Sequence, residues 1–158
     1  MATLQIAHLS DLHILRDYNG SMLDRAPLRQ PVPPVNYVLA GIREAVAAHP
    51  DVIVLTGDLV HEGTEEDYRY LRELIERECS GIPGIPVLGN HDFKQAFYRG
   101  YLGEERTGSY TARYELGGYR FLVLDTAQEG NGCGVISQEQ VQWLAEELAQ
   151  PYGQGTIL

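Results

Sequence analysis

Short apolar runs alternate along the chain with longer amphipathic stretches. The runs at residues 4–9, 52–55 and 85–88 consist mainly of aliphatic side chains, which is typical of buried strands. Between them, residues 36–49 and 62–78 carry apolar side chains at every third or fourth position, which predicts two amphipathic helices. Strands that alternate with helices in this way predict an α/β fold. The residues expected to face inward from these helices are Val35, Val38, Leu39, Ile42, Val46, Tyr68, Leu71, Leu74 and Ile75.

The pattern changes after residue 92. A short helix is expected over residues 93–101. Residues 109–115 and 119–124 then alternate around Gly117-Gly118, which predicts a hairpin with a two-residue turn. A last helix is expected to start near Ser137, with Val141, Leu144 and Leu148 on its inward face.

An irregular segment separates the first strand from the first helix. Residues 18–34 contain Gly20 and four prolines, Pro27, Pro31, Pro33 and Pro34. Long loops of this kind often form the wall of a functional site. Tyr18, at the start of the segment, is either an ordinary core or rim residue or a side chain that stacks on a base.

Polar motifs follow directly on the three apolar runs. Asp11-Leu12-His13 follows the first, Gly57-Asp58-Leu59-Val60 the second and Gly89-Asn90-His91-Asp92 the third. In open α/β sheets, ligands collect at the carboxyl ends of the strands, so these motifs should meet in space. Carboxylate, amide and imidazole groups gathered at one point suit divalent metals. The spacing therefore predicts a metal site that contains Asp11, His13, Asp58 and Asn90, with His91 beside it.

The ordered set D-x-H, G-D-x-x and G-N-H-D resembles the calcineurin-like metallophosphoesterases. The protein serine/threonine phosphatases of that family carry G-D-x-V-D-R-G and G-N-H-E, whereas this chain has Gly57-Asp-Leu-Val-His-Glu-Gly63 and ends its third motif in Asp92. It is more similar to the class III cyclic nucleotide phosphodiesterases and the glycerophosphodiesterases. The stretch 134–137, followed by Gln142-Trp143-Leu144, is also similar to that subgroup.

The resemblance implies a four-layer α/β/β/α sandwich and a metal-dependent phosphodiesterase. Two divalent or trivalent ions (Mn, Fe or Zn) would bind, with Asp11 and His13 on the first, Asn90 on the second and Asp58 as the bridge. A metal-bridging hydroxide would attack a small phosphorylated substrate, with a cyclic nucleotide as the leading candidate and a glycerophosphodiester as another. His91 would act near the leaving group, and Asp92 would fix the tautomer of the His91 imidazole.

The chain departs from the family pattern after its third motif. The family has two later histidine motifs, but none of the five histidines here follows His91, and residues 155–158 look like the opening of another strand. The resemblance thus implies that residues 1–158 are a metallophosphoesterase domain that is incomplete at its C-terminus. Weak or no activity, a weak or empty second metal site and an uncovered sheet edge that favours a homo-oligomer are then expected. A non-catalytic binding or scaffold module is the alternative function.

Composition narrows the possible partners. The net charge of −10 argues against binding a nucleic-acid backbone, which needs a basic surface. No apolar run approaches the roughly 18 residues of a membrane span, so no membrane association is expected. Cys79 and Cys133 lack C-x-x-C spacing and are expected to be free thiols in a reducing compartment. The first strand starts almost at Met1, which leaves no room for a signal peptide before it, so a cytoplasmic location is predicted.

Some candidate residues also have ordinary structural interpretations. Asp11 could cap a turn, and Asn90 could occupy a left-handed turn position. His8 lies within a strand and is expected to be structural. His61 either points into the site or belongs to a solvated loop or helix end. Asp125 follows a strand, where a structural turn role is favoured over substrate contact.

Overall fold

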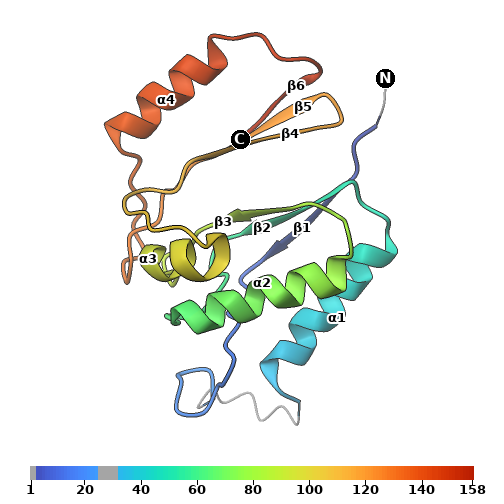
Figure 1. Cartoon of the computed structure of the whole chain (residues 1–158), viewed down its shortest axis with the longest axis vertical. Coiled ribbons are helices and arrows are strands. Elements are labelled where there is room, and N and C mark those ends of the chain that lie inside the picture. Colours follow the sequence, from blue (N-terminus) through green and yellow to red (C-terminus); the bar gives the residue numbers. More distant parts are fainter. Residues whose placement is uncertain (1–2, 25–31) are drawn as a thin grey trace.

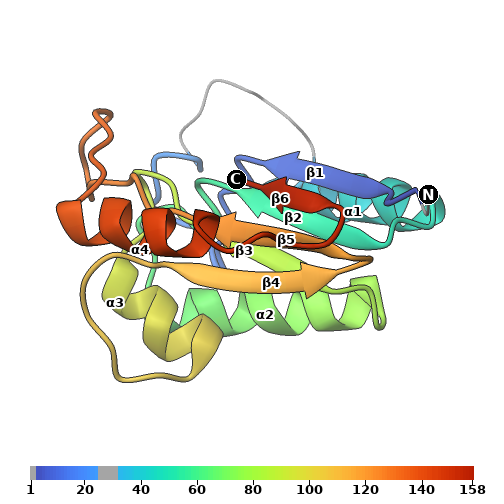
Figure 2. The ribbon, with the colours of Figure 1, turned by 90° about the horizontal axis from the view of Figure 1, so that it is seen from above.

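Two three-stranded sheets face each other in this chain, with helices on their outer sides (Figure 1). The computed structural model describes residues 3–24 and 32–158. Helices α1 and α2 cover one face of the first sheet, the second sheet lies over its other face, and α4 lies beyond the second sheet. Figure 2, from above, shows the strands of the second sheet stacked over the first. The predicted α/β/β/α layering is confirmed.

The first sheet is parallel and has the order β1-β2-β3. Its strands are β1 (Ile6–Ser10), β2 (Val52–Thr56) and β3 (Gly84–Val87). Its crossovers contain α1 (Pro34–Ala47) and α2 (Glu65–Cys79). Because all three strands run in the same direction, the three polar motifs leave the sheet at the same edge.

The second sheet contains the predicted hairpin. β4 (Ala112–Leu116) and β5 (Tyr119–Val123) pair antiparallel, and β6 (Gly155–Ile157) pairs parallel with β5. Gly117 and Gly118 both have positive φ, 58° and 82°, which is the conformation that a tight two-residue turn requires.

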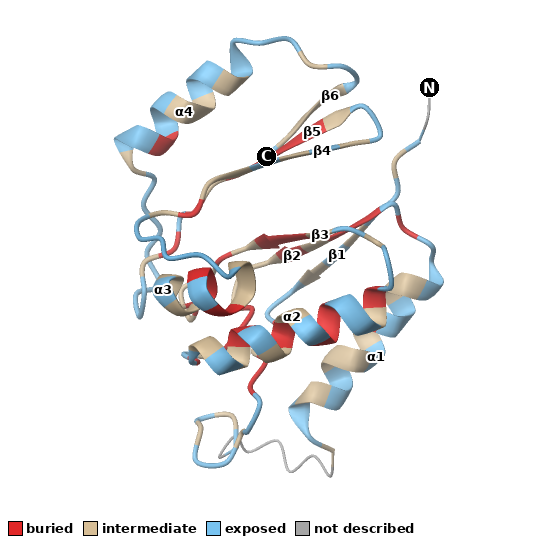
Figure 3. Cartoon of the chain, viewed as in Figure 1, coloured by how far each residue is buried: buried red, intermediate tan, exposed pale blue. Residues whose placement is uncertain are grey.

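Helix α2 buries the stripe that its spacing predicts, whereas in α1 only Ile42 is buried and the other predicted positions are half-buried. Tyr68, Leu71, Leu74 and Ile75 of α2 are all buried (Figure 3), as is Ile42 of α1. Helix α2 begins after Thr64, whose backbone amide and hydroxyl both donate to the carboxylate of Asp67. The helix therefore starts three residues after the predicted Glu62.

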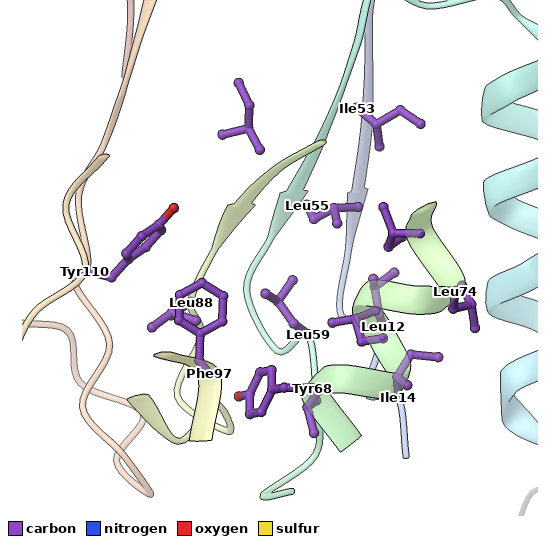
Figure 4. Close-up of a cluster of buried hydrophobic side chains, with 14 of the residues drawn as sticks. Leu12, Ile14, Ile53, Leu55, Leu59, Tyr68, Leu74, Leu88, Phe97 and Tyr110 are labelled. Carbon is purple, nitrogen blue, oxygen red and sulfur yellow. The ribbon is translucent and has the colours of Figure 1, made fainter. Parts of the chain in front are cut away.

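An aromatic cluster joins α2 to the segment behind the third motif. That segment forms α3 (Lys94–Phe97) and a π-helical turn, η1 (Tyr98–Leu102), over the range where a short helix was predicted. The ring of Phe97 contacts Tyr68 edge-on at 5.8 Å between centroids and Tyr110 at 5.0 Å. Figure 4 shows these rings beside the aliphatic side chains between the first sheet and its helices.

Helix α4 (Gln138–Leu148) forms where it was predicted, but its inward face is different. Val141 is 54% exposed and Leu148 47% exposed, whereas Gln140 is only 3% exposed. The side chain of Gln140 accepts from the amide of Asp125 (2.8 Å) and donates to its carbonyl (2.9 Å). The prediction that Val141 and Leu148 face inward is therefore wrong, because these two hydrogen bonds bring Gln140 to the buried side instead.

Several smaller expectations can be compared with the structure. Cys79 and Cys133 are both free, as predicted. The hydroxyl of Tyr18 donates to the carbonyl of His13 (3.2 Å). The prolines Pro27 and Pro31 of the irregular segment lie outside the described residues. Among the helices that the structure describes, none is long and apolar enough to cross a bilayer.

Candidate metal centre

The three ligand motifs lie side by side because their backbones continue the pairing of the parallel strands. The amide of Asp11 donates to the carbonyl of Gly57 (3.1 Å), and the amide of His13 donates to the carbonyl of Asp58 (2.8 Å). The amide of Gly57 donates in turn to the carbonyl of Val87, at the end of β3 (2.9 Å). The motifs are thereby held together at the carboxyl edge of the first sheet.

Three candidate ligands adopt a backbone conformation that residues other than glycine rarely use. The φ angle is 54° at Asp11, 44° at His13 and 48° at Asp58. In this left-handed region the Cβ atom carries a steric cost, which Asp tolerates better than most residues. Such conformations persist where the surroundings hold them, and they gather at functional sites. The hydrogen bonds between the motif loops provide that restraint here.

Asp11, His13 and Asp58, three of the four ligands that the motif spacing predicts, lie together in one cluster. Each offers one ligand atom, and these atoms all lie within 4.8 Å of one another. Nε2 of His13 is 3.8 Å from Oδ2 of Asp58. Two carboxylates and one imidazole at this spread are a donor set that suits a divalent transition metal. The residues present therefore fit a metal ion.

The same Asp58 carboxylate also touches the third motif. Its Oδ1 accepts from the backbone amide of His91 (3.0 Å), and a Cβ atom on Gly89 would collide with it. Asn90 lies between these two residues, and its carbonyl accepts from the amide of Gly130 (3.0 Å). The φ of Asn90 is not positive, so the alternative of a left-handed turn residue is wrong.

Asp92 has a different role from the one expected. Its buried carboxylate accepts from the amides of Leu59 (3.0 Å), Val60 (2.9 Å) and Gly89 (2.8 Å) and from the hydroxyl of Tyr68 (2.7 Å). Burial raises the pKa of Asp92, and these hydrogen bonds oppose the rise. The prediction that Asp92 orients the His91 imidazole is wrong. The carboxylate oxygens of Asp92 instead join the loop after β2 to the loop after β3.

The imidazole of the candidate ligand His13 lies close to two other imidazoles, those of His61 and His91. The ring of His61 lies 5.1 Å from that of His13 and stacks on that of His91 at 4.8 Å, and Nδ1 of His91 is 3.3 Å from a carboxylate oxygen of Glu62. Burial, followed by the neighbouring imidazoles of His13 and His91, lowers the pKa of His61. Of its two interpretations, the structure supports the one in which His61 points into the site. Its position just after the second motif was the available signal.

Two other candidates have structural surroundings, as expected. His8 bonds through Nε2 to the hydroxyl of Thr56 on the neighbouring strand. Asp125 is buried and pairs with Nζ of Lys94 at 2.7 Å, while its carboxylate also accepts from the amides of Tyr110 and Ala127. The Asp125 carboxylate thus provides acceptors for two backbone amides, that of Tyr110 and that of Ala127 in the turn after β5.

Comparison with known proteins agrees with this geometry. The family model of the calcineurin-like phosphoesterases matches residues 4–147, a span that includes all three motifs. The chain belongs to the calcineurin-like phosphoesterase family. The fold of this calcineurin-like chain is also similar to that of a dimetal phosphatase from Danio rerio, with a TM-score of 0.59, 15% identity and coverage of 92% of this chain and 65% of the other.

Relatives of this calcineurin-like chain include bacterial phosphodiesterases. It is 35% identical to a probable cyclic nucleotide phosphodiesterase of Rhodococcus erythropolis, over 97% of this chain and 50% of the relative. It is also 35% identical to a cAMP/cGMP dual specificity phosphodiesterase of Mycobacterium tuberculosis, over 97% and 48%. A glycerophosphodiester phosphodiesterase of Enterobacter lignolyticus is 28% identical, over 91% and 51%. The chain spans about half the length of these relatives.

Proposed function

We propose that residues 1–158 form part of a metallophosphoesterase domain that hydrolyses small phosphodiesters at two metal ions. The observation that carries this proposal is the placement of Asp58. One of its carboxylate oxygens faces His13 and the other accepts from the amide of His91. A carboxylate engaged on both sides is suited to bridge two ions about 3.5–4 Å apart.

The ligands divide into two sets around Asp58. Asp11 and His13 would hold the first ion with Asp58, and Asn90 would hold the second with it. Mixed carboxylate and imidazole donors favour Mn²⁺, Fe or Zn²⁺ over Mg²⁺ or Ca²⁺. Bound ions would supply activation of water near neutral pH and positive charge to offset that of the phosphodiester.

His91 is the residue proposed to act on the leaving group. Its backbone amide is held by Asp58, and its Nδ1 lies near the carboxylate of Glu62 at 3.3 Å. With the Nδ1 proton held by that carboxylate, the doubly protonated His91 ring would release its Nε2 proton to the departing alkoxide and be left neutral, protonated on Nδ1. Asp92 contributes indirectly, because its four hydrogen bonds hold the second and third motifs in place.

The proposed substrate is a cyclic nucleotide, with a glycerophosphodiester as the second choice. Relatives named for both activities match almost the whole chain. The net charge of −10 supports a small substrate, since a polyanion would be repelled along its length. A small phosphodiester carries one negative charge, which bound metal ions offset locally.

Hydrolysis by the reconstituted chain tests the proposal. The 158-residue chain is freed of metal, supplied with Mn²⁺ and incubated with bis-p-nitrophenyl phosphate and with cAMP. Asp58→Asn should abolish the metal-dependent rate. Asp51→Asn is the matched control, because Asp51 precedes β2 at the opposite edge of the same sheet and bonds the amide of Gln5. Metal binding with a rate that Asp58→Asn leaves unchanged would favour the binding-module alternative, and absence of metal binding would refute the site.

A further inference from the structure

His61 contacts a candidate metal ligand through a specific ring atom. Its Nδ1 lies 3.2 Å from Nδ1 of His13, which is hydrogen-bond distance. The other ring nitrogen of His13, Nε2, faces Oδ2 of Asp58 at 3.8 Å. The imidazole of His13 is therefore engaged on two sides, by the carboxylate of the metal cluster and by a second imidazole.

A hydrogen bond between two ring nitrogens needs one donor and one acceptor. A neutral imidazole carries a proton on one nitrogen and a lone pair on the other. If Nε2 of His13 keeps its lone pair toward the cluster, the proton of that ring must lie on Nδ1. Nδ1 of His61 must then accept it, and the proton of His61 must lie on its own Nε2.

We propose that His61 is a positioning residue, which fixes His13 in the tautomer whose Nε2 lone pair is directed to the side of Asp58 and is free for an ion. This inference rests on the proposed metal site. Histidine ligands commonly donate their second ring N–H to a carboxylate, a backbone carbonyl or water, and this bond orients the ring and raises its basicity. Here a neighbouring imidazole takes that place.

The surroundings of His61 hold its ring where this task requires. On one side the backbone amide of Val60 is bound by Asp92, and on the other the amide of Glu62 donates to the carbonyl of His91 (2.9 Å). The ring itself stacks on that of His91, with an angle of 28° between the planes. Both chain neighbours and one face of the ring are thus anchored to the other motifs.

The tautomers can be read without any metal. In a long-range ¹H–¹⁵N spectrum of the metal-free 158-residue chain, His13 should appear as the Nδ1–H tautomer and His61 as the Nε2–H tautomer. His61→Leu removes the acceptor, so His13 should then populate both tautomers. His61→Asn should restore the Nδ1–H form, because its amide oxygen lies near the position of the lost Nδ1. His49→Asn, at an exposed position, is the control and should leave His13 unchanged.

Metal affinity gives the second readout. Calorimetric titration with Mn²⁺ should show that His61→Leu binds about 10–100-fold more weakly, the range typical for loss of such a partner. His61→Asn should recover most of that affinity, and circular dichroism should show that each variant is folded. A His13 that is Nε2-protonated in the unaltered chain would overturn the proposal. So would a ¹⁵N shift showing that His61 itself binds the ion. Failure to hydrolyse phosphodiesters would count against the proposed function but leave the tautomer result intact.

Discussion

Asp58 and His91 meet at one hydrogen bond but belong to different sides of the proposed reaction. The carboxylate of Asp58 lies among the candidate ligands, whereas His91 offers it a backbone amide and keeps its ring outside the cluster of Asp11, His13 and Asp58. The backbone contact survives any change of the His91 side chain. Metal binding and proton transfer should therefore be separable by substitution.

His91→Ala is expected to retain its metal and lose turnover by roughly 10²–10⁴-fold, the usual contribution of a proton-transfer group. Asp58→Asn is expected to lose metal and turnover together, because it removes the shared negative charge. Elemental analysis and hydrolysis of bis-p-nitrophenyl phosphate measure the two effects. A His91→Ala chain that loses its metal would show that the imidazole is a ligand.

Asp92 is expected to matter for stability more than for chemistry. In Asp92→Asn, an amide NH₂ would face two of the four donors that the carboxylate now satisfies, so the free energy of unfolding should fall by about 2–4 kcal/mol. Tyr68→Phe removes only one donor and should cost about 1.5 kcal/mol. Urea denaturation of both variants checks the order. An Asp92→Asn chain as stable as the original would contradict the proposal that Asp92 holds the loops after β2 and β3 together.

The residues of the centre differ in how far their roles could be predicted. Asp11, His13 and Asp58 could be placed together because the ends of parallel strands meet at one edge. The role of Asp92 could not, because its partners come from the loops after β2 and β3 and from α2. For His61 the position after the second motif indicated the site, but stacking between side chains on different loops leaves no periodic pattern that could have excluded the solvated loop.

At the scale of elements, α4 shows how one polar side chain sets the rotation of a helix. Gln140 satisfies both backbone groups of Asp125 at a point where the turn after β5 is buried. Leaving these groups without partners would cost more than exposing an aliphatic side chain. The buried face of α4 therefore contains Gln140, while Val141 faces outward.

Substitutions in α4 test this rotation. Gln140→Ala should lower the free energy of unfolding by about 1–3 kcal/mol, because it leaves a buried amide and carbonyl unpaired. Val141→Ala, one residue later, should change it by no more than about 0.5 kcal/mol. Chemical denaturation of the two variants gives the comparison. A large loss at Val141 would mean that another surface covers it in solution.

Element boundaries were less predictable than the elements themselves. The periodicity of α2 could be read from its buried stripe, and the pair Thr64 and Asp67, three residues apart, is close to the capping box that starts the helix, whereas the acidic run had suggested a start at Glu62. Glu62 has a φ of 50° and donates its amide to the carbonyl of His91, so it is held outside the helix. That bond joins segments far apart in the sequence, and local patterns carry no sign of it. The same holds for the hydrogen bonds of Gln140.

At the scale of the whole molecule, acidic charge and metal binding are coupled. The chain carries a net charge of −10, and Asp11 and Asp58 bring two carboxylates to one cluster. An ion that binds the folded chain there offsets this repulsion and shifts the folding equilibrium by mass action.

The face-to-face arrangement of the two sheets was predicted from family resemblance, because periodicity predicts strands but not which sheets stack.

Metal should therefore stabilise the chain measurably. At a free Mn²⁺ concentration of about 100 times its Kd, the free energy of unfolding should rise by about 2.7 kcal/mol, and Tm by roughly 5–10 °C. Thermal unfolding with Mn²⁺ and with a chelator measures the difference. Asp58→Asn is the control and should show little shift. Equal Tm values for the original chain under both conditions would mean that the cluster does not bind the ion.

The hydrogen bond from the amide of Gly130 to the carbonyl of Asn90 links the loop after β5 to the third motif. Exchange of that amide with deuterium requires this bond to open, so its rate reports how often the Asn90 loop separates from its neighbour. Because Gly130 lies outside the ligand set, labelling there leaves the donor atoms untouched. The exchange rate of the Gly130 amide in heavy water can thus report whether the Asn90 side of the candidate metal centre becomes more ordered as ions are added.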